Sequence, residues 1–367
     1  MRIDRLHLEN FKNYESLKVD FHEKIICLVG LNGMGKTNIL DAIHYLAYTK
    51  SALGVSDLQV IRKGSPYFLS TGKFSGKNDL EVKCYLEKEG KKLIKVNEIE
   101  LERISDHIGN ISVVLSSPYD HDIVHGPGEI RRKWVDGCIA SHDHNYLEQL
   151  LKYKKLLRQR NALLKQSGGQ LSRSAKDLLE TYDIRLIAQS GFLADHRKEF
   201  LERLEPYFDH RVIELVEEKE KIKIDYQSKV NDDFENYFRS QLPKDLITCR
   251  TNAGIHKDEF SFSINGNPLK KFGSQGQQKS FLIAIRLAQY DYLSNMKKEK
   301  PILLLDDVFD KLDDERIQRI SQILKKDKGI DQVFITDARK ERSLSFFDEK
   351  EKTKIIELDN GKIKGDG

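Results

Sequence analysis

The chain has 367 residues, of which 39% are hydrophobic and 33% charged, and its formal net charge is +4. This length exceeds one typical domain, and the composition excludes a disordered or fibrous protein. The four cysteines are far apart, no run reaches about 18 apolar residues, and the N-terminus lacks an apolar signal core. We therefore expect a cytoplasmic protein without a disulfide framework, a zinc site or a membrane span.

Short strands and turns around one helix are predicted for the first 120 residues. Patterns typical of strands occur at residues 2–11, 16–21, 65–74, 80–88 and 91–98. Denser apolar runs at 24–29 and 111–118 predict strands that are buried on both faces.

The segment 129–208 carries almost no strand pattern. Apolar residues at helical spacing predict one helix over 146–164 and a second over 178–201, with a turn at 167–172 between them. We expect these helices to pack into a compact arm.

Helix and strand patterns alternate in the last hundred residues. After strands at 221–226 and 258–266 come a helix at 281–293, a buried strand at 301–307, a helix at 314–326 and a strand at 332–337. This order predicts a parallel sheet covered by helices. The expected fold is an α/β head, residues 1–125 and 221–367, with an inserted helical arm, residues 126–220.

The stretch GLNGMGKTNIL at residues 30–40 fits the phosphate-loop pattern G-x-x-x-x-G-K-[ST]. It follows a buried strand and opens a helix, where free N–H groups and the helix dipole favour an anion. Lys36 would reach the terminal phosphates and Thr37 would meet Mg²⁺. A plain strand-to-helix turn is the alternative, and the strand–loop–helix setting favours nucleotide binding.

Two carboxylates end the apolar run PILLLDD at 301–307. They leave the strand at its C-terminal edge, where ligands bind in open α/β sheets. Asp306 is placed to hold Mg²⁺, through water, and Asp307 to orient or deprotonate an attacking water. Paired Asp residues after a strand also serve as turn or cap residues, but the phosphate loop favours the catalytic interpretation.

A third motif, FGSQGQQKS at 272–280, precedes a long helix. Ser274, Gln275 and Gly276 would present a hydroxyl, an amide and bare N–H groups at the helix N-terminus, which is a second anion-binding surface. One nucleotide does not need two such surfaces, whereas two facing chains could each close theirs on the γ-phosphate held by the other. An ordinary N-cap turn is the alternative.

The order of these motifs resembles the ATP-binding-cassette (ABC) ATPases of the SMC class, and several stretches resemble the RecF family of bacterial recombinational repair. In chain order they are ENFKNYESL, GLNGMGKTNILDAIHYL, VVLSSPYDHDIVHGPGEIRRKWVD, GIHKDEFSFSING, FGSQGQQKS and PILLLDDVFDKLD. The resemblance spans the whole chain.

This resemblance implies an ABC-type head that binds ATP and Mg²⁺ and dimerises when ATP is bound. It implies a weak DNA-dependent ATPase that binds single- and double-stranded DNA near gaps and junctions. It also implies partnership with RecR and RecO, and through them the loading of RecA.

The resemblance assigns roles to matching positions. The nucleotide positions are Gly30, Leu31, Asn32, Gly33, Met34, Gly35, Lys36 and Thr37, with Asn10, Phe11, Lys12 and Asn13 near the other end of the nucleotide. The signature acting in trans is Ser274, Gln275, Gly276 and Gln277, and the D-loop contains Asp310 and Asp313. Catalysis is assigned to Lys36, Asp306 and Asp307, and Mg²⁺ binding to Thr37 and Asp306.

Some positions depart from the family pattern. The usual G-P-H-R-D-D is GIHKDE here, and Asp307 stands where many ABC proteins have Glu, which fits slow turnover. Asp337 stands after QVFIT, where the family pattern has a switch histidine. The sequence therefore does not identify the residue that senses the γ-phosphate. The segment 118–120 is the candidate Q-loop.

Two basic clusters are candidates for DNA binding. One contains Arg131 and Arg132, and the other contains Lys152, Lys155 and Arg158 on a predicted helix. Such charges attract phosphates without reading sequence, although a solvated helix face is the usual meaning of a charge run.

Other classes of protein fit the sequence less well. A transporter subunit is disfavoured because the segment 129–208 has a polar face, and an SMC-like nuclease would need a long coiled coil, a Cys-x-x-Cys hook or a nuclease domain. An ATP-binding scaffold without hydrolysis, or another SMC-like ATPase, is the closest alternative.

Overall fold

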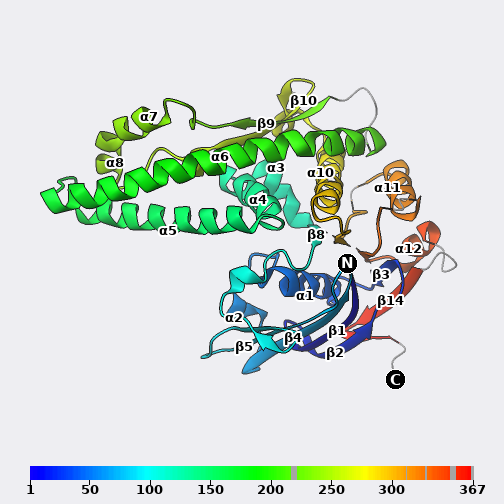
Figure 1. Ribbon diagram of the computed structural model, residues 1–367. Coiled ribbons are helices and arrows are strands. Elements are labelled where there is room, and N and C mark those ends of the chain that lie inside the picture. Colours follow the sequence, from blue (N-terminus) through cyan, green and yellow to red (C-terminus); the bar gives the residue numbers. More distant parts are fainter. Residues whose placement is uncertain (216–220, 311, 327–328, 348–352, 365–367) are drawn as a thin grey trace. The chain divides into compact units, whose positions relative to one another are not determined.

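The computed structural model describes residues 1–215, 221–310, 312–326, 329–347 and 353–364, which form two compact units (Figure 1). Unit 1 contains Met1–His121 and the described parts of Tyr207–Glu218 and Ser274–Gly367. Unit 2 contains Asp122–Pro206 and the described part of Lys219–Gly273.

Unit 1 contains two six-stranded sheets. The antiparallel sheet has the order β2-β1-β4-β5-β6-β7, with β1 at Arg2–Phe11, β2 at Tyr14–Asp20, β4 at Tyr67–Ser75, β5 at Leu80–Glu87, β6 at Leu93–Val96 and β7 at Ile99–Glu100. The second sheet has the order β15-β14-β3-β13-β12-β8, with β3 at Ile25–Val29, β8 at Val113–Ser116, β12 at Ile302–Leu305, β13 at Val333–Asp337, β14 at Thr353–Asp359 and β15 at Lys362–Ile363.

The second sheet is parallel except at the short edge strand β15. Every residue of β3, β12 and β13 is buried, as the continuous apolar runs of these strands require when both faces are covered. Because the strands are parallel, the residues that follow β3, β12 and β13 meet at one edge of the sheet.

Helix α1 (Lys36–Tyr48) packs in a core that both sheets share. Its Tyr45 ring contacts the rings of Phe11 on β1 and Phe68 on β4 edge to face, while Ile39 and Ile43 are buried in the same core as β3 and β12. The other helices of unit 1 are α2 (Asp57–Val60), the C-terminal end of α6, α10 (Gln275–Lys297), α11 (Asp314–Lys326) and α12 (Lys340–Phe346).

Unit 2 contains long helices and one small sheet. Its helices are α3 (His121–His125), α4 (Gly128–Ala140), α5 (His144–Gln166), α6 (Arg173–Leu215, as far as Pro206), α7 (Phe234–Ser240), α8 (Leu242–Thr248) and α9 (Leu269–Phe272). The antiparallel sheet has the order β11-β10-β9, with β9 at Ile222–Gln227, β10 at Glu259–Ile264 and β11 at Asn267–Pro268. Figure 1 shows α5 and α6 side by side, where the Arg160 guanidinium binds the Asp183 carboxylate at 2.6 Å.

The extent of the arm differs from the prediction. Unit 2 begins at Asp122, close to the expected residue 126, but it includes residues up to Gly273 instead of ending near 220. The strand patterns at 221–226 and 258–266 are predicted to belong to the head, but β9 pairs only with β10 among the described strands, and β10 packs on α4.

Buried arginines hold unit 2 together. Arg197 on α6 binds the carboxylates of Asp136 at 2.9 Å and Asp258 at 2.7 Å, and it also donates to the Ile255 carbonyl at 2.7 Å. Arg160 binds Asp245 at 2.6 Å besides Asp183. Asp258 and Ile255 belong to the GIHKDE stretch, so this motif connects β10 to α6 within the unit.

None of the helices in the described ranges is long and apolar enough to cross a membrane.

Replacing Arg197 tests the role of this network. Arg197→Met is expected to lower the free energy of unfolding by about 3–5 kcal/mol, because Asp136 and Asp258 stay buried without their cation. Arg203→Met on the same helix removes an exposed pair with Glu199 and should change that free energy by less than about 0.5 kcal/mol. Urea unfolding measures both, and similar losses in the two variants would contradict the assignment.

Candidate functional site

The phosphate loop connects β3 to α1, and its glycines adopt conformations that other residues avoid. Gly30 has φ +147° and Gly35 has φ +106°. A Cβ added at Gly30 would lie 2.4 Å from the Leu358 carbonyl oxygen, and one at Gly35 would lie 2.5 Å from the Tyr14 hydroxyl. The loop can therefore fold this way only with glycine at both positions.

Lys36 lies inside the loop that precedes it. Its ammonium donates to the carbonyl oxygens of Gly30 at 2.6 Å and Leu31 at 2.9 Å. Burial lowers the pKa of Lys36, while the carboxylates of Asp307 and Asp306 act in the opposite direction. The ammonium is thus held between the loop and the acidic pair.

The other loop residues leave room for an anion at the start of α1. Leu31, Asn32 and Gly33 are exposed, Met34 is half-buried, and the first turn of α1 carries no acidic residue. The N–H groups of this turn and the helix dipole favour a phosphate there.

The end of the chain supports the loop from one side. β14 pairs with β3, and after β14 the Gly361 N–H donates to the Met34 carbonyl at 3.3 Å. The Asn360 N–H contacts the Met34 sulfur at 3.1 Å.

Thr37 and Asp306 meet at the sheet edge. The Thr37 hydroxyl donates to the Asp306 carboxylate at 2.9 Å, although the two residues are far apart in the chain. Burial raises the pKa of Asp306, and hydrogen bonds from Thr336 and Thr37 lower it. A hydroxyl and a carboxylate side by side are hard oxygen donors, so these residues fit a Mg²⁺ ion that also binds water and phosphate.

Thr336 is a site residue that the sequence patterns did not indicate. Its hydroxyl donates to the Asp306 carboxylate at 2.7 Å and accepts the Asp307 N–H at 2.8 Å. It lies on β13, between β3, which leads into the phosphate loop, and β12, which Asp306 follows directly. Asp307 itself has a left-handed backbone, with φ +49°, and Thr336 helps to hold it.

Asp337, which replaces the expected switch histidine, is buried and paired. Arg342 on α12 binds its carboxylate at 2.6 and 2.8 Å. The hydrogen bond that Arg342 donates to Asp337 is the main cause that raises the pKa of Arg342.

The signature turn caps α10. The Ser274 hydroxyl accepts the Gln277 N–H at 3.2 Å, and the Gln277 side chain accepts the Ser274 N–H at 2.7 Å. Ser274 and Gln277, two of the four signature residues, thus stabilise the N-terminus of α10 as a capping box. Their presence in the sequence can be explained by helix stability alone. Gln275 is exposed, and a Cβ at Gly276 would lie 2.1 Å from the Arg316 guanidinium.

The two D-loop residues have separate contacts. The Asp310 carbonyl accepts the Lys279 ammonium at 2.7 Å. The Asp313 carboxylate accepts the Arg316 N–H at 2.9 Å, at the start of α11. Lys311, between them in the predicted D-loop, lies outside the described residues.

The turn between β1 and β2 lies beside the phosphate loop. The Asn38 amide, in the first turn of α1, donates to the Asn13 side chain at 2.7 Å, and the Tyr14 hydroxyl donates to the Gly35 carbonyl at 3.1 Å.

Three neighbours of Asn13 are occupied by protein contacts. Phe11 is fully buried in the core, Lys12 binds the buried Asp41 carboxylate at 2.5 Å, and Asn10 accepts the Ser65 hydroxyl at 2.9 Å. The place of these residues near the other end of the nucleotide stays a prediction.

The two basic clusters differ in what they contact. Arg132 donates to the Asp258 carbonyl at 2.6 Å, and Arg131 donates to the Gly126 carbonyl at 3.0 Å, so both guanidinium groups bind within unit 2. Their role in DNA binding stays a prediction.

Lys152, Lys155 and Arg158 are exposed on α5. Lys152 approaches Glu148 at 3.7 Å and is 56% exposed, which leaves its charge available to solvent.

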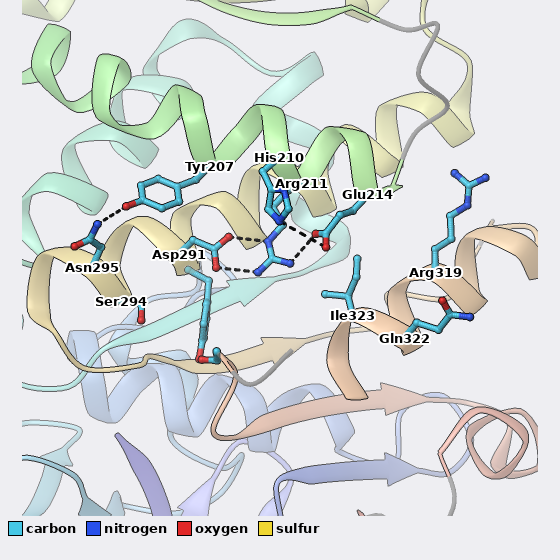
Figure 2. A pocket seen from close by; sticks show the side chains of 12 residues that line it. Tyr207, His210, Arg211, Glu214, Asp291, Ser294, Asn295, Arg319, Gln322 and Ile323 are labelled. Atoms are coloured by element: carbon cyan, nitrogen blue, oxygen red, sulfur yellow. Dashed lines mark hydrogen bonds and ion pairs between the residues drawn. The ribbon is translucent and has the colours of Figure 1, made fainter. Parts of the chain in front are cut away.

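A pocket of about 800 Å³ in unit 1 lies between α6, α10 and α11 (Figure 2). Arg211 binds the Asp291 carboxylate with two hydrogen bonds, of 2.7 and 2.9 Å. The pocket contains none of the motif residues, and its ion pair fixes the C-terminal end of α6 to α10.

Comparisons with known proteins agree on one family. The AAA ATPase domain model matches residues 1–365. The DNA replication and repair protein RecF of Cytophaga hutchinsonii is 41% identical over 366 residues, 99% of this chain and 96% of the relative. RecF of Flavobacterium johnsoniae is 40% identical over 346 residues, 94% and 96% of the two chains.

Solved structures agree in fold. The recombination mediator protein RecF-ATP in the RecFOR pathway has a TM-score of 0.87 and 29% identity, over 98% of this chain and 96% of that chain. The Smc head domain derived from Pyrococcus furiosus has a TM-score of 0.58 and 18% identity, over 99% and 95%. The expected fold class is confirmed: unit 1 is an ABC-type head of the SMC kind, and unit 2 is its inserted helical arm.

Thr336→Val tests whether the bridging hydroxyl supports the acidic pair. The variant removes one of the two hydroxyl donors to the buried Asp306 carboxylate and leaves the Asp307 N–H without its Thr336 acceptor, so the free energy of unfolding should fall by about 1–3 kcal/mol. Thr336→Ser keeps the hydroxyl and should lose clearly less in the same urea titration. Greater loss in the Ser variant would show that packing of the methyl group dominates.

Proposed function

The chain belongs to the RecF family of DNA replication and repair proteins, and on that premise we propose that two copies close around shared ATP and hold gapped DNA. The chain is an ATP-binding ATPase of the DNA-repair class. The proposal adds the dimer, the DNA and the slow, DNA-dependent hydrolysis.

The observation that carries the proposal is the meeting of Thr37 and Asp306 beside Lys36. A phosphate loop that binds any anion needs only its backbone and lysine. A hydroxyl and a carboxylate directed to one point add a place for the Mg²⁺ that accompanies a nucleotide. Bound there, Mg²⁺ would neutralise phosphate charge, and Thr37 and Asp306 would hold it.

Asp307 is the proposed base. It follows Asp306 at the sheet edge, and its charge acts on Lys36. A carboxylate near the terminal phosphate can orient or deprotonate the attacking water. Asp is one methylene shorter than the Glu of many ABC proteins, which fits slow turnover.

The signature turn supplies the proposed link between two chains. The first turn of α10 presents N–H groups and the exposed Gln275, which suit the γ-phosphate of a nucleotide bound to the other copy. ATP would favour the closed pair because it binds both halves only in that state. Loss of the γ-phosphate removes this link and opens the pair.

DNA would bind the exposed basic residues Lys152, Lys155 and Arg158 of α5. Their contact with phosphates would release counterions and would not depend on base sequence. Single- and double-stranded DNA at gaps is the expected substrate, with RecO and RecR as partners and RecA as the protein loaded. The pathway named for the solved RecF-ATP structure supports this context.

Two variants separate ATP binding from hydrolysis. Lys36→Met should abolish ATP-dependent dimerisation, because the phosphates lose their cation. Asp307→Asn should bind ATP and stay dimeric, because only the proposed base is changed, while phosphate release falls by at least about a hundredfold. Sedimentation with ATP and a phosphate-release assay with gapped DNA measure both properties.

A monomeric Asp307→Asn variant would contradict the shared-nucleotide scheme. Dimerisation of the wild type without phosphate release would favour the ATP-binding scaffold instead.

The α5 surface can be tested by charge removal. Lys152→Ala/Lys155→Ala/Arg158→Ala should weaken binding of gapped DNA and lower the slope of log affinity against log salt by up to about 3. Lys63→Ala/Lys88→Ala/Lys91→Ala removes the same charge from exposed positions of the head and should leave that slope unchanged. Full affinity and an unchanged slope in the first variant would exclude this surface.

A further inference from the structure

Helix α10 carries a lysine that binds the turn containing the acidic residues. One turn after the signature, the Lys279 ammonium donates to the carbonyl oxygens of Asp307 at 3.1 Å and Asp310 at 2.7 Å. These acceptors belong to the backbone, so Lys279 fixes the path of the chain and not merely a flexible side chain. Hydrogen bonds from a charged donor are stronger than neutral ones.

The turn that Lys279 binds needs support. Asp307 has φ +49°, a conformation that is costly for a residue with a side chain. Within the turn, the Asp310 N–H donates to the Asp307 carbonyl at 3.3 Å, a long bond. A cavity of about 220 Å³ lies beside it, lined by Lys279, Asp306 and Asp307 among others. The middle residues of the turn, Val308 and Phe309, are buried, so Lys279 supports the turn on the side that faces the cavity.

An ion pair fixes the body of α10. Two turns after Lys279, Arg286 binds the Asp120 carboxylate with hydrogen bonds of 2.7 and 2.9 Å. Asp120 belongs to the candidate Q-loop and is buried. Further along α10, Asp291 binds Arg211, as Figure 2 shows.

These contacts place three segments of the site on one helix. The signature turn is the N-terminal end of α10, Lys279 connects the helix to the turn after β12, and Arg286 connects it to the segment after β8. A helix is stiff over such a length, so a displacement of its first turn moves Lys279 by about the same amount.

We propose that Lys279 is a positioning residue that couples the signature turn to Asp307 and Asp310 of the same chain. When the signature turn meets the phosphate of the facing copy, Lys279 holds the Asp307 backbone in the conformation in which its carboxylate addresses the attacking water. Each chain's own acidic pair is thereby set by the nucleotide bound to its partner. This inference rests on the proposed function, because it requires two chains that share ATP.

The test compares ATP binding with turnover in Lys279→Met, Lys279→Arg and Lys279→Gln. Lys279→Met keeps the length of the side chain but removes its donor. It should retain the ATP affinity and ATP-dependent dimerisation of the wild type, within about twofold, while the single-turnover rate of hydrolysis falls at least about tenfold, as misplaced catalytic groups do. Lys279→Arg, which can donate to both carbonyls, should recover most of the rate, and Lys279→Gln should recover less.

The control is Lys298→Gly, which removes an exposed lysine at the C-terminal end of α10, at a φ of +50° that glycine accepts. Its rate should equal that of the wild type. A Lys279→Met rate within twofold of the wild type, or equal losses of ATP affinity and rate in all three Lys279 variants, would overturn the inference. If Lys279→Met fails to fold, the Arg and Gln variants decide. A hydrolysis rate that falls more in Lys279→Gln than in Lys279→Arg, at unchanged ATP affinity, supports the inference, and equal rates in the two variants would overturn it. A wild-type chain that releases no phosphate would overturn the proposed function, and this inference with it.

Discussion

The structure of the site depends on one hydrogen-bonded group at the edge of the parallel sheet. Thr37 and Thr336 both donate to the Asp306 carboxylate, and Thr336 also accepts the Asp307 N–H. These residues follow or end β3, β12 and β13, which are neighbours in the order β3-β13-β12. The register of three buried strands therefore sets the distance between the phosphate loop and the acidic pair. Neither motif could do chemistry without the other at this distance.

The buried ion pairs of the arm determine how its helices pack. Arg160 and Arg197 are almost completely inaccessible, and each binds two carboxylates. Such pairs contribute less to stability than their number suggests, because each charge loses its hydration on burial. Their geometry is demanding, however, and it selects one packing of α5 and α6 against the segments that contain Asp245 and Asp258. Arg131 and Arg132 also donate to backbone carbonyls within this unit.

Local patterns predicted the parts of the site that depend on neighbours in sequence. The phosphate loop is predictable because Gly30, Gly35, Lys36 and Thr37 lie close together in the sequence, and Asp306 is predictable because it directly follows an apolar run. Thr336 and Lys279 were not recognised, because their partners are distant in the chain and nothing in the surrounding residues marks them. The same reason explains the arm: strands β9 and β10 have an ordinary strand pattern, and only their pairing with each other shows to which unit they belong.

The last strand has a consequence for how the protein is made. β14 pairs with β3, the Leu358 carbonyl lies against Gly30, and the Asn360–Gly361 turn contacts Met34. The support of the phosphate loop thus comes from residues that leave the ribosome long after the loop itself. Because domains tend to fold as they emerge, the nucleotide pocket of the nascent head stays incomplete until β14 has been synthesised. A chain cut short before β14 would carry the complete motif in its sequence and lack the walls that give the motif its shape.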